Sequence, residues 1–357
     1  MMLIILFVIF SIAFLILSHE AAHFFAAKLF GMKVEEFGFG FPPRMFAWRP
    51  RNKSGVPSET EYSFNWLPFG GFVRIAGEND RMSGNQGALE SLPPEEKKRI
   101  FSFQPAWKRA AVTAAGVLMN FFAGWMLLSV ILMIGTPPIV LVGGVQSGSP
   151  AAAAGLVSGD VLTGFTHAQN FVDFVNAHRG EDIVVRVMRE GNALELHATP
   201  KRITAEREGA LGVSVGDDGV PRLGFLSALK EGFLEAVFLV QSTVIGFWQL
   251  LVNLLVHARL LEGVVGPIGI VAIAVQTAKT GFLHLLELIA FISVNLAVIN
   301  LMPFPALDGG RLLFLAVEKI KGSPLSRRLE VYANGFGLAF LLVLLTLISA
   351  RDIALRL

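Results

Sequence analysis

MMLIILFVIFSIAFLILSHEAAHFFAAKL, residues 1–29, is an apolar stretch long enough to cross a lipid bilayer as one helix. It contains the pattern HEAAH at residues 19–23. Residues four apart lie on one face of a helix, so His19 and His23 can reach the same metal ion while Glu20 is free to act as a base. The stretch therefore predicts a membrane-spanning helix that carries a zinc-hydrolase motif.

The composition is that of a membrane protein with a soluble insert. Of 357 residues, 53% are hydrophobic and 16% are charged, which is too apolar for an ordinary soluble protein. The formal net charge of +2 comes with no basic stripe, so a nucleic-acid partner is not expected. The chain has no cysteine, which excludes disulfides and thiolate ligands, so a zinc site must use histidine and carboxylate groups.

Basic residues orient the chain in the membrane. Residues 1–29 have neither a basic start nor a small-residue cleavage pattern, so they are predicted to be a retained anchor rather than a signal peptide. A second span is predicted at residues 108–136. Lys28, Lys33 and Lys108 flank the connection between these spans, and the positive-inside rule places that connection in the cytoplasm. The N-terminus is therefore expected outside.

Residues 30–107 are predicted to form a cytoplasmic β-hairpin region and a mobile loop. Aromatic and β-branched runs separated by Pro and Gly are typical of strands, and they occupy residues 33–41, 45–48, 61–66 and 71–75. Their Phe and Trp content predicts hairpins that associate with the membrane interface near the His pair. Residues 78–99 are polar and rich in Gly, Asn and Glu, which is typical of a mobile surface segment.

Residues 139–215 have the composition of a small soluble α+β domain. Within them, residues 183–188 and 193–198 are predicted to form a hairpin. The stretch GSPAAAAGLVSGDVL, residues 148–162, resembles PDZ domains of the circularly permuted bacterial kind. That resemblance implies that residues 209–215 bind an extended peptide by strand addition, and a spacer domain without a ligand is the alternative.

Residues 232–256 are long and apolar enough to span the membrane, but the region 222–265 is predicted to form amphipathic surface helices. Polar side chains recur along them, at Glu235, Gln241, Gln249 and Asn253. A span here would place the carboxylate described next on the opposite side of the membrane from the His pair. The remaining spans are predicted at residues 280–310 and 330–350, which makes four spans with both termini outside.

Residues 300–310, NLMPFPALDGG, break the third span with two prolines and two glycines. Irregular backbone at membrane depth persists only where protein or water surrounds it, and a carboxylate there is costly unless it is paired or bound to a metal. Asp308 is therefore a functional candidate that the broken helix could bring to the His pair. Its alternative role is an N-cap for the helix that follows.

HEAAH, NLMPFPALDGG and the PDZ-like insert together resemble the site-2 protease family of intramembrane zinc metalloproteases, and most closely its RseP-like bacterial group. The resemblance implies a membrane α-helical fold of four transmembrane helices, a cytoplasmic membrane-associated β-hairpin region and one extracytoplasmic PDZ domain. The RseP relative has a tandem PDZ pair where this chain has one insert. Arg311 stands where that relative has His, and no effect on the metal is expected from this difference.

The resemblance also implies roles for individual residues. His19, His23 and Asp308 would bind one zinc ion, and Glu20 would be the catalytic base. The residues expected to bind substrate are Asn295, Asn300, Pro303 and Pro305. The residues expected to belong to structural motifs are Gly116 and Asn120, which match the family's GxxxN pattern, and Gly309.

The function implied by the resemblance is regulated intramembrane proteolysis, in which peptide bonds within or near the transmembrane segments of single-span proteins are hydrolysed. The expected substrates are anti-sigma factors or remnant signal peptides. The expected location is the bacterial inner membrane, with the termini and the PDZ domain extracytoplasmic and the active site towards the cytoplasm. The alternatives are a zinc transporter and a catalytically silent PDZ scaffold, and Glu20 argues against both because neither needs a general base.

Overall fold

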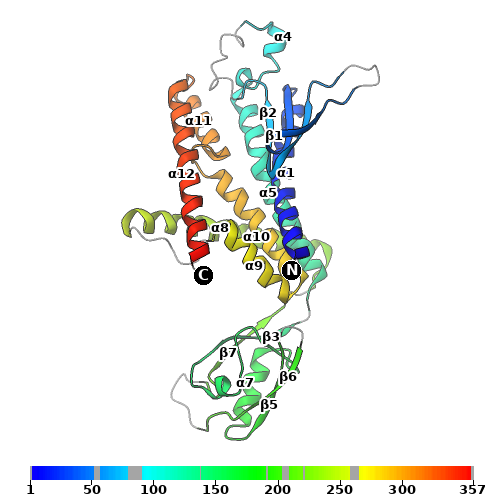
Figure 1. Ribbon diagram of the computed structural model, residues 1–357, viewed down its shortest axis with the longest axis vertical. Helices are drawn as coiled ribbons and strands as arrows, with labels where there is room; N and C mark the ends of the chain where they lie inside the picture. Colours follow the sequence, from blue (N-terminus) through cyan, green and yellow to red (C-terminus); the bar gives the residue numbers. More distant parts are fainter. Residues whose placement is uncertain are drawn as a thin grey trace. The chain divides into compact units, whose positions relative to one another are not determined.

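The computed structural model describes residues 2–51, 57–78, 91–136, 138–189, 192–202, 209–219, 222–257 and 265–354 (Figure 1). The chain forms two compact units, Met1–Leu128 with Gly232–Leu357, and Ser129–Glu231. Residues 79–90, the larger part of the predicted mobile segment, lie outside the described residues, as do residues 258–264 of the predicted surface helices.

The described residues contain five helices that are long and apolar enough to cross a membrane. They are α1 (Met2–Leu29), α5 (Ala106–Ile134), α8 (Phe225–His257), α10 (Phe282–Leu301) and α12 (Arg327–Ala354). α8 is a single long helix where the sequence pattern predicted several shorter ones. It runs crosswise to α12 (Figure 1).

α9 (Pro267–Thr280) precedes α10 and is an element that the sequence pattern did not indicate. Its first turn is capped from the far end of the chain, because Asp352 Oδ2 accepts hydrogen bonds from the backbone N–H groups of Gly266 (2.9 Å) and Gly269 (2.8 Å). A Cβ at Gly266 or Gly269 would come within 2.9 or 2.7 Å of that oxygen. Both positions therefore need glycine for the end of α12 to meet α9.

A two-stranded antiparallel sheet follows α1 and is built from β1 (Val34–Trp48) and β2 (Glu61–Ile75). Both strands bend, so their halves pair separately. Across the sheet, the paired segments lie in the order 46–48, 62–64, 36–39 and 71–75. The four predicted runs are thus present, but as segments of one bent hairpin rather than as several hairpins.

Two features attach this hairpin to the helices. Its base joins α1 and α5 in a buried apolar cluster made of Ala27, Met32, Val34, Ile75, Phe101 and Val112. Inside the sheet, the Glu36 carboxylate is 3% exposed and binds Arg44 (2.7 Å) and Arg74 (2.5 Å). A buried carboxylate with two guanidinium partners is satisfied, so it can stabilise the bend instead of weakening the sheet.

The second unit is an α+β domain around a five-stranded antiparallel sheet in the order β6-β5-β4-β3-β7. Its elements are β3 (Ile139–Val145), α6 (Pro150–Ala153), β4 (Val161–Leu162), α7 (Ala168–Ala177), β5 (Ile183–Arg189), β6 (Asn192–Ala198) and β7 (Val213–Asp218). The predicted hairpin is β5–β6. β7 forms one edge of the sheet among the described strands.

The motif at residues 148–162 forms a capped helical turn. Ser149 Oγ accepts a hydrogen bond from the Ala152 N–H (3.2 Å), and Pro150 occupies the first helical position. Gly155 ends the turn with a φ of 83°, a conformation that glycine adopts without strain. These small residues and caps explain why so short a helix forms in this place.

The same motif buries one carboxylate, that of Asp160, which is 0% exposed. Burial alone would raise the pKa of Asp160. The Arg189 guanidinium, with two contacts of 2.7 Å, and the Val157 N–H at 3.0 Å outweigh that cost, so the pKa of Asp160 lies below its ordinary value.

Candidate metal centre

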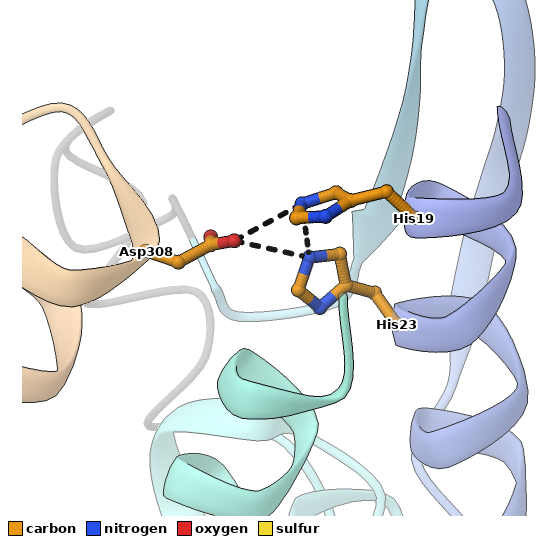
Figure 2. A group of neighbouring side chains, drawn as sticks. All are labelled: His19, His23 and Asp308. Atoms are coloured by element: carbon orange, nitrogen blue, oxygen red, sulfur yellow. Dashed lines mark hydrogen bonds and ion pairs between the residues drawn. The ribbon is translucent and has the colours of Figure 1, made fainter. Parts of the chain in front are cut away.

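His19 and His23 lie on successive turns of α1 and are buried, with 6% and 7% of their surface exposed. Their Nε2 atoms are 3.1 Å apart, and the two rings meet edge to face at 84°. Figure 2 shows both rings directed at Asp308, which comes from a different part of the chain. The helical spacing thus places the imidazoles together, as the HEAAH pattern predicts.

The break after α10 delivers Asp308 to this pair. Asp308 is the first residue of α11 (Asp308–Lys321), and its Oδ2 atom lies 3.1 Å from His19 Nε2 and 3.4 Å from His23 Nε2 (Figure 2). Leu307 occupies the N-cap position and makes no side-chain capping bond. Asp308 is therefore not the N-cap that the alternative interpretation required, and its carboxylate is directed at the imidazoles.

Two glycines let α11 turn back onto the end of α10. A Cβ at Gly309 would overlap the backbone carbonyls of Leu301 and Met302. A Cβ at Gly310 would overlap the carbonyl of Phe304. The double glycine that follows Asp308 in the sequence is therefore a requirement of this close backbone approach.

α5 packs against the two imidazoles. Gly116 is so close that a Cβ there would lie 2.6 Å from His19 Cε1 and 2.7 Å from His19 Nε2. On either side of Gly116, the Val112 carbonyl oxygen lies 2.8 Å from His23 Nδ1, and the Asn120 amide nitrogen lies 3.3 Å from His19 Nδ1. Each ring therefore has one neighbour on α5 at the nitrogen that faces away from Asp308.

The three converging atoms suit one cation. The Val112 carbonyl can only accept a hydrogen bond, so His23 Nδ1 carries the proton and His23 Nε2 presents a lone pair. His19 Nε2 and the buried Asp308 Oδ2 atom face the same point, and no amide or guanidinium group donates to that oxygen. When His19 Nε2 also presents its lone pair, the three atoms repel one another unless positive charge lies among them.

The spacing of these atoms also suits zinc. Ligand atoms about 2.0–2.1 Å from a tetrahedral zinc ion lie roughly 3.3 Å from one another. The distances here are 3.1, 3.1 and 3.4 Å. Within the described residues, His19, His23 and Asp308 are the group of histidine and carboxylate side chains whose ligand atoms all lie within 4.8 Å of one another.

A cavity of about 210 Å³ opens beside these atoms. Glu20 lines it from α1, and Asn300 lines it from the last turn of α10. Its remaining lining residues are Ile16, His19, Asn120, Leu296, Ala306, Leu307 and Asp308. Glu20 and Asn300 thus share a chamber of mixed polar and apolar lining with His19 and Asp308, and the chamber is large enough to hold water.

The other residues expected to bind substrate lie elsewhere. Asn295 Oδ1 accepts a hydrogen bond from Thr243 Oγ1 of α8 (3.0 Å), and Asn295 Nδ2 donates to the Phe291 carbonyl (2.8 Å). Pro303 and Pro305 are not among the residues that line the cavity. Their place in the break between α10 and α11 matches the predicted interruption of the helix.

Two ion pairs hold α11 in place, and the sequence pattern did not indicate either of them. Arg311 pairs with Glu78, which directly follows the hairpin, and Glu318 pairs with Arg109 of α5 at 3.2 Å. The Arg109 and Glu318 side chains are only 15% and 10% exposed. The four residues are far apart in the sequence, so only the tertiary structure pairs them. Arg311, from which no effect was expected, thus anchors the helix that begins with Asp308.

The hairpin also reaches the site. A Cβ at Gly71 would lie 3.5 Å from the Glu20 side chain, so residues 71–75 run past Glu20. These residues pair with β1 on one edge, and the described residues supply no strand on their other edge. An open backbone edge therefore lies next to the candidate base.

Comparison with known proteins identifies relatives over nearly the whole chain. Residues 7–344 match the model of Peptidase family M50. The chain is 31% identical over 364 residues to a protein of Rhizobium meliloti (strain 1021) named as a zinc metalloprotease, with 97% of this chain and 95% of that protein covered. It is 29% identical over 418 residues to the Regulator of sigma-W protease RasP of Bacillus subtilis (strain 168), with 95% of each covered.

A protein of Brucella suis biovar 1 (strain 1330), also named as a zinc metalloprotease, is 32% identical over 340 residues, which cover 89% of this chain and 86% of that protein. The zinc-compatible donor set and the apolar helices agree with these matches. The chain therefore belongs to peptidase family M50, the site-2 proteases, and is a membrane-bound zinc metalloprotease.

Proposed function

We propose that this protein hydrolyses peptide bonds within or near the transmembrane segments of single-span membrane proteins, in regulated intramembrane proteolysis. The observation that carries the proposal is the convergence of His19, His23 and Asp308 beside Glu20, within helices apolar enough to span a membrane. Three protein ligands leave a further coordination position open, which is the arrangement of catalytic rather than structural zinc sites.

His19, His23 and Asp308 would hold the zinc ion. When bound, zinc makes an adjacent water easier to deprotonate and polarises a carbonyl group. Glu20 lines the cavity beside these ligands, where it can take a proton from the attacking water and pass it to the leaving amide nitrogen. The water oxygen then bonds to the carbonyl carbon as the C–N bond breaks. Asn300, in the same cavity, can donate a hydrogen bond to the substrate backbone.

A substrate helix must unwind before its peptide bonds can be attacked, because a helix in lipid pairs all its backbone groups internally. The open edge at residues 71–75, beside Glu20, is the proposed place where the unwound segment adds as a strand. Proline at several positions from Phe72 to Ile75 removes N–H donors from that edge and is expected to slow cleavage. Cleavage at the wild-type rate by such variants would reject strand addition.

The proposed topology has four spans, α1, α5, α10 and α12, with α8 along the membrane surface. Basic residues support a cytoplasmic position for the connection from α1 to α5 and for the connection from α10 to α12. Lys28 and Lys108 flank the first connection, and Lys319 and Lys321 lie in the second. The termini and the second unit would then be extracytoplasmic, in a bacterial inner membrane. The chain has no cysteine, so Ser147→Cys and Ser323→Cys test this directly. In intact cells, a membrane-impermeant maleimide should label only the first.

The second unit is proposed to act as a PDZ domain that binds an extended peptide. A groove of about 200 Å³ lies between α7 and the edge strand β7, and its walls include Phe171, Val175, Leu211, Val213 and Val215. An edge strand beside an apolar groove can take a peptide by strand addition. A spacer role predicts that no peptide binds this groove.

The proposed substrates are anti-sigma factors and remnant signal peptides. Support comes from the Bacillus subtilis relative, which is named for regulation of sigma-W, and from the site within apolar helices. Comparing the membrane proteomes of wild-type and Glu20→Gln cells would identify the actual substrates, because uncut proteins should accumulate in the variant.

The deciding experiment uses the purified protein with a model transmembrane substrate. Wild-type protein should cleave it, and Glu20→Gln or removal of zinc by a chelator should abolish cleavage, with zinc restoring the chelated sample. Failure of the wild type on several substrates would favour a zinc transporter or a silent PDZ scaffold. Zinc uptake by liposomes that contain the protein would then separate these two.

A further inference from the structure

One face of α5 contacts both imidazoles of the metal centre. Val112, Gly116 and Asn120 are four residues apart, so they line one side of the helix. The middle position has no side chain, and this lets the helix approach the rings. The inference that follows concerns Asn120 and rests on the proposed zinc site.

His23 shows what a ligand imidazole needs from this face. Its Nδ1 atom donates to the Val112 carbonyl, which leaves Nε2 free to bind a metal. The hydrogen bond also fixes the rotation of the ring. Metal-binding histidines generally have such a partner at the second nitrogen, and its loss weakens metal binding.

His19 has the same requirement, and Asn120 is the group in position to meet it. Asn120 is 1% exposed, and its amide nitrogen lies 3.3 Å from His19 Nδ1. In that orientation Nδ1 accepts a hydrogen bond, so a neutral ring carries its proton on Nε2, the atom that faces Asp308. The Asn120 Oδ1 atom is meanwhile buried without a partner. One polar contact therefore opposes metal binding and leaves an unsatisfied oxygen.

Rotating the amide by 180° removes the conflict with metal binding. The nitrogen and oxygen of an amide have nearly the same shape, and which one occupies a position follows from the hydrogen bonds it can make. After rotation, Oδ1 faces His19 and accepts a hydrogen bond from Nδ1–H. The buried oxygen gains a donor, and His19 Nε2 presents its lone pair toward Asp308 and His23.

We propose that Asn120 is a positioning residue that accepts a hydrogen bond from His19 Nδ1 and holds Nε2 toward the metal. The backbone of this residue is itself anchored, because Ser293 Oγ of α10 donates to the Asn120 carbonyl at 2.7 Å. Asn120 thus does for His19 what the Val112 carbonyl does for His23. It acts through His19 and need not touch the substrate.

Two variants of similar size separate this role from packing. Asn120→Leu removes the acceptor, and Asn120→Asp keeps it. The matched control is Thr113→Val, which removes a buried hydroxyl that bonds only within α5, to the Arg109 carbonyl at 3.0 Å. Zinc affinity is measured by competition with a chromophoric chelator, and ligand geometry by the visible spectrum of the cobalt-substituted protein.

Asn120→Leu should weaken zinc binding by roughly 10- to 100-fold and alter the cobalt spectrum. The zinc affinities of Asn120→Asp and Thr113→Val should stay within about threefold of the wild-type affinity. Equal zinc affinity and an unchanged cobalt spectrum in Asn120→Leu would overturn the inference while leaving the protease intact. A wild-type protein that binds no zinc would overturn the proposed function and this inference together.

A measurement on the wild type covers the case in which Asn120→Leu fails to fold. The ¹⁵N spectrum of histidine-labelled, zinc-loaded protein reports which imidazole nitrogens carry protons, and replacing the other five histidines by glutamine leaves the signals of His19 and His23. Protonated Nδ1 atoms on both rings support the inference. An unprotonated Nδ1 on one of them contradicts it, because His23 Nδ1 is fixed as a donor by the Val112 carbonyl.

Discussion

Asp160 in the second unit is fully buried and Asp308 in the first is mostly buried, but the surroundings of the two carboxylates differ. Asp160 is enclosed by donors, namely the Arg189 guanidinium and the Val157 N–H. Asp308 Oδ2 faces two imidazole nitrogens and has no guanidinium or backbone N–H partner. A satisfied carboxylate stabilises a fold, and one left without donors in a buried place is expected to bind a cation. Substitution of each residue should therefore affect a different property.

Asp308→Asn should give the largest effect. The substitution removes the anionic ligand, so bound zinc should fall well below one per chain and cleavage should drop by about 10²-fold or more. Zinc content and cleavage rate check these two points. Full zinc content in Asp308→Asn would remove the distinction between the two aspartates.

Gly116→Ala should give the next largest effect, because it displaces the imidazole rings but leaves the Asp308 carboxylate in place. Its methyl group would lie 2.6 Å from a ring carbon of His19, so the ring or α5 must shift. Zinc affinity should fall by roughly 10-fold or more, as for loss of an orienting contact. Gly335→Ala in α12 is a control for helix propensity, because a Cβ there meets nothing within 4 Å. Equal zinc affinity in both variants would argue against a close fit at Gly116.

Asp160→Asn should destabilise the second unit by about 1–3 kcal/mol at neutral pH, since Arg189 would lose its charged partner. Zinc content should not change. The pKa of Asp160 is lower in the folded than in the unfolded protein, so its contribution to stability is present above about pH 4 and is lost as the pH falls through the folded pKa. Unfolding curves of the two proteins should therefore converge in acid. A constant difference down to low pH would contradict this account.

The Arg311–Glu78 ion pair offers a smaller test of how Asp308 is held. Arg311→Gln and Glu78→Gln should each lower cleavage by several-fold, and the double variant should lose little more than either single one, because both remove the same contact. The cleavage rates of the wild type, the two single variants and the double variant make up the double-mutant cycle that measures this. Fully additive losses would mean that the two residues act independently.

The smallest effect on zinc content is expected at a second cluster of polar side chains within the apolar helices. Glu235, His284 and Glu287 line a cavity of about 290 Å³. Among the described residues they do not form a set of metal-ligand atoms within 4.8 Å of one another. His284→Gln should therefore leave zinc content unchanged. Loss of zinc from this variant would show that donor spacing is a poor guide in these helices.

Local sequence patterns predicted much of this protein. The apolar runs predicted the long helices, and the alternation of aromatic runs with Pro and Gly predicted the four segments of the hairpin sheet. The caps and glycines of residues 148–162 predicted the helical turn that the second unit contains. All these features depend on neighbours within a few residues, which is why they can be read from the sequence.

Features that depend on distant contacts were not predicted. α9 owes its first turn to Asp352, some eighty residues away. The ion pairs of α11 likewise depend on what packs against it. Asn300 lines the cavity while Asn295 binds α8, although both were expected to bind substrate from the same helix.

The sequence by itself determined which chemistry is available, because helical spacing puts His19 and His23 on one face and the absence of cysteine restricts the other ligands to oxygen or nitrogen. The broken helix at residues 300–310 marked Asp308 as the candidate carboxylate, and the tertiary structure decided how that carboxylate reaches the imidazoles. Asp308 reaches the imidazoles because glycine allows α11 to fold back onto α10. Contacts between residues so far apart depend on packing, and no local pattern contains that information.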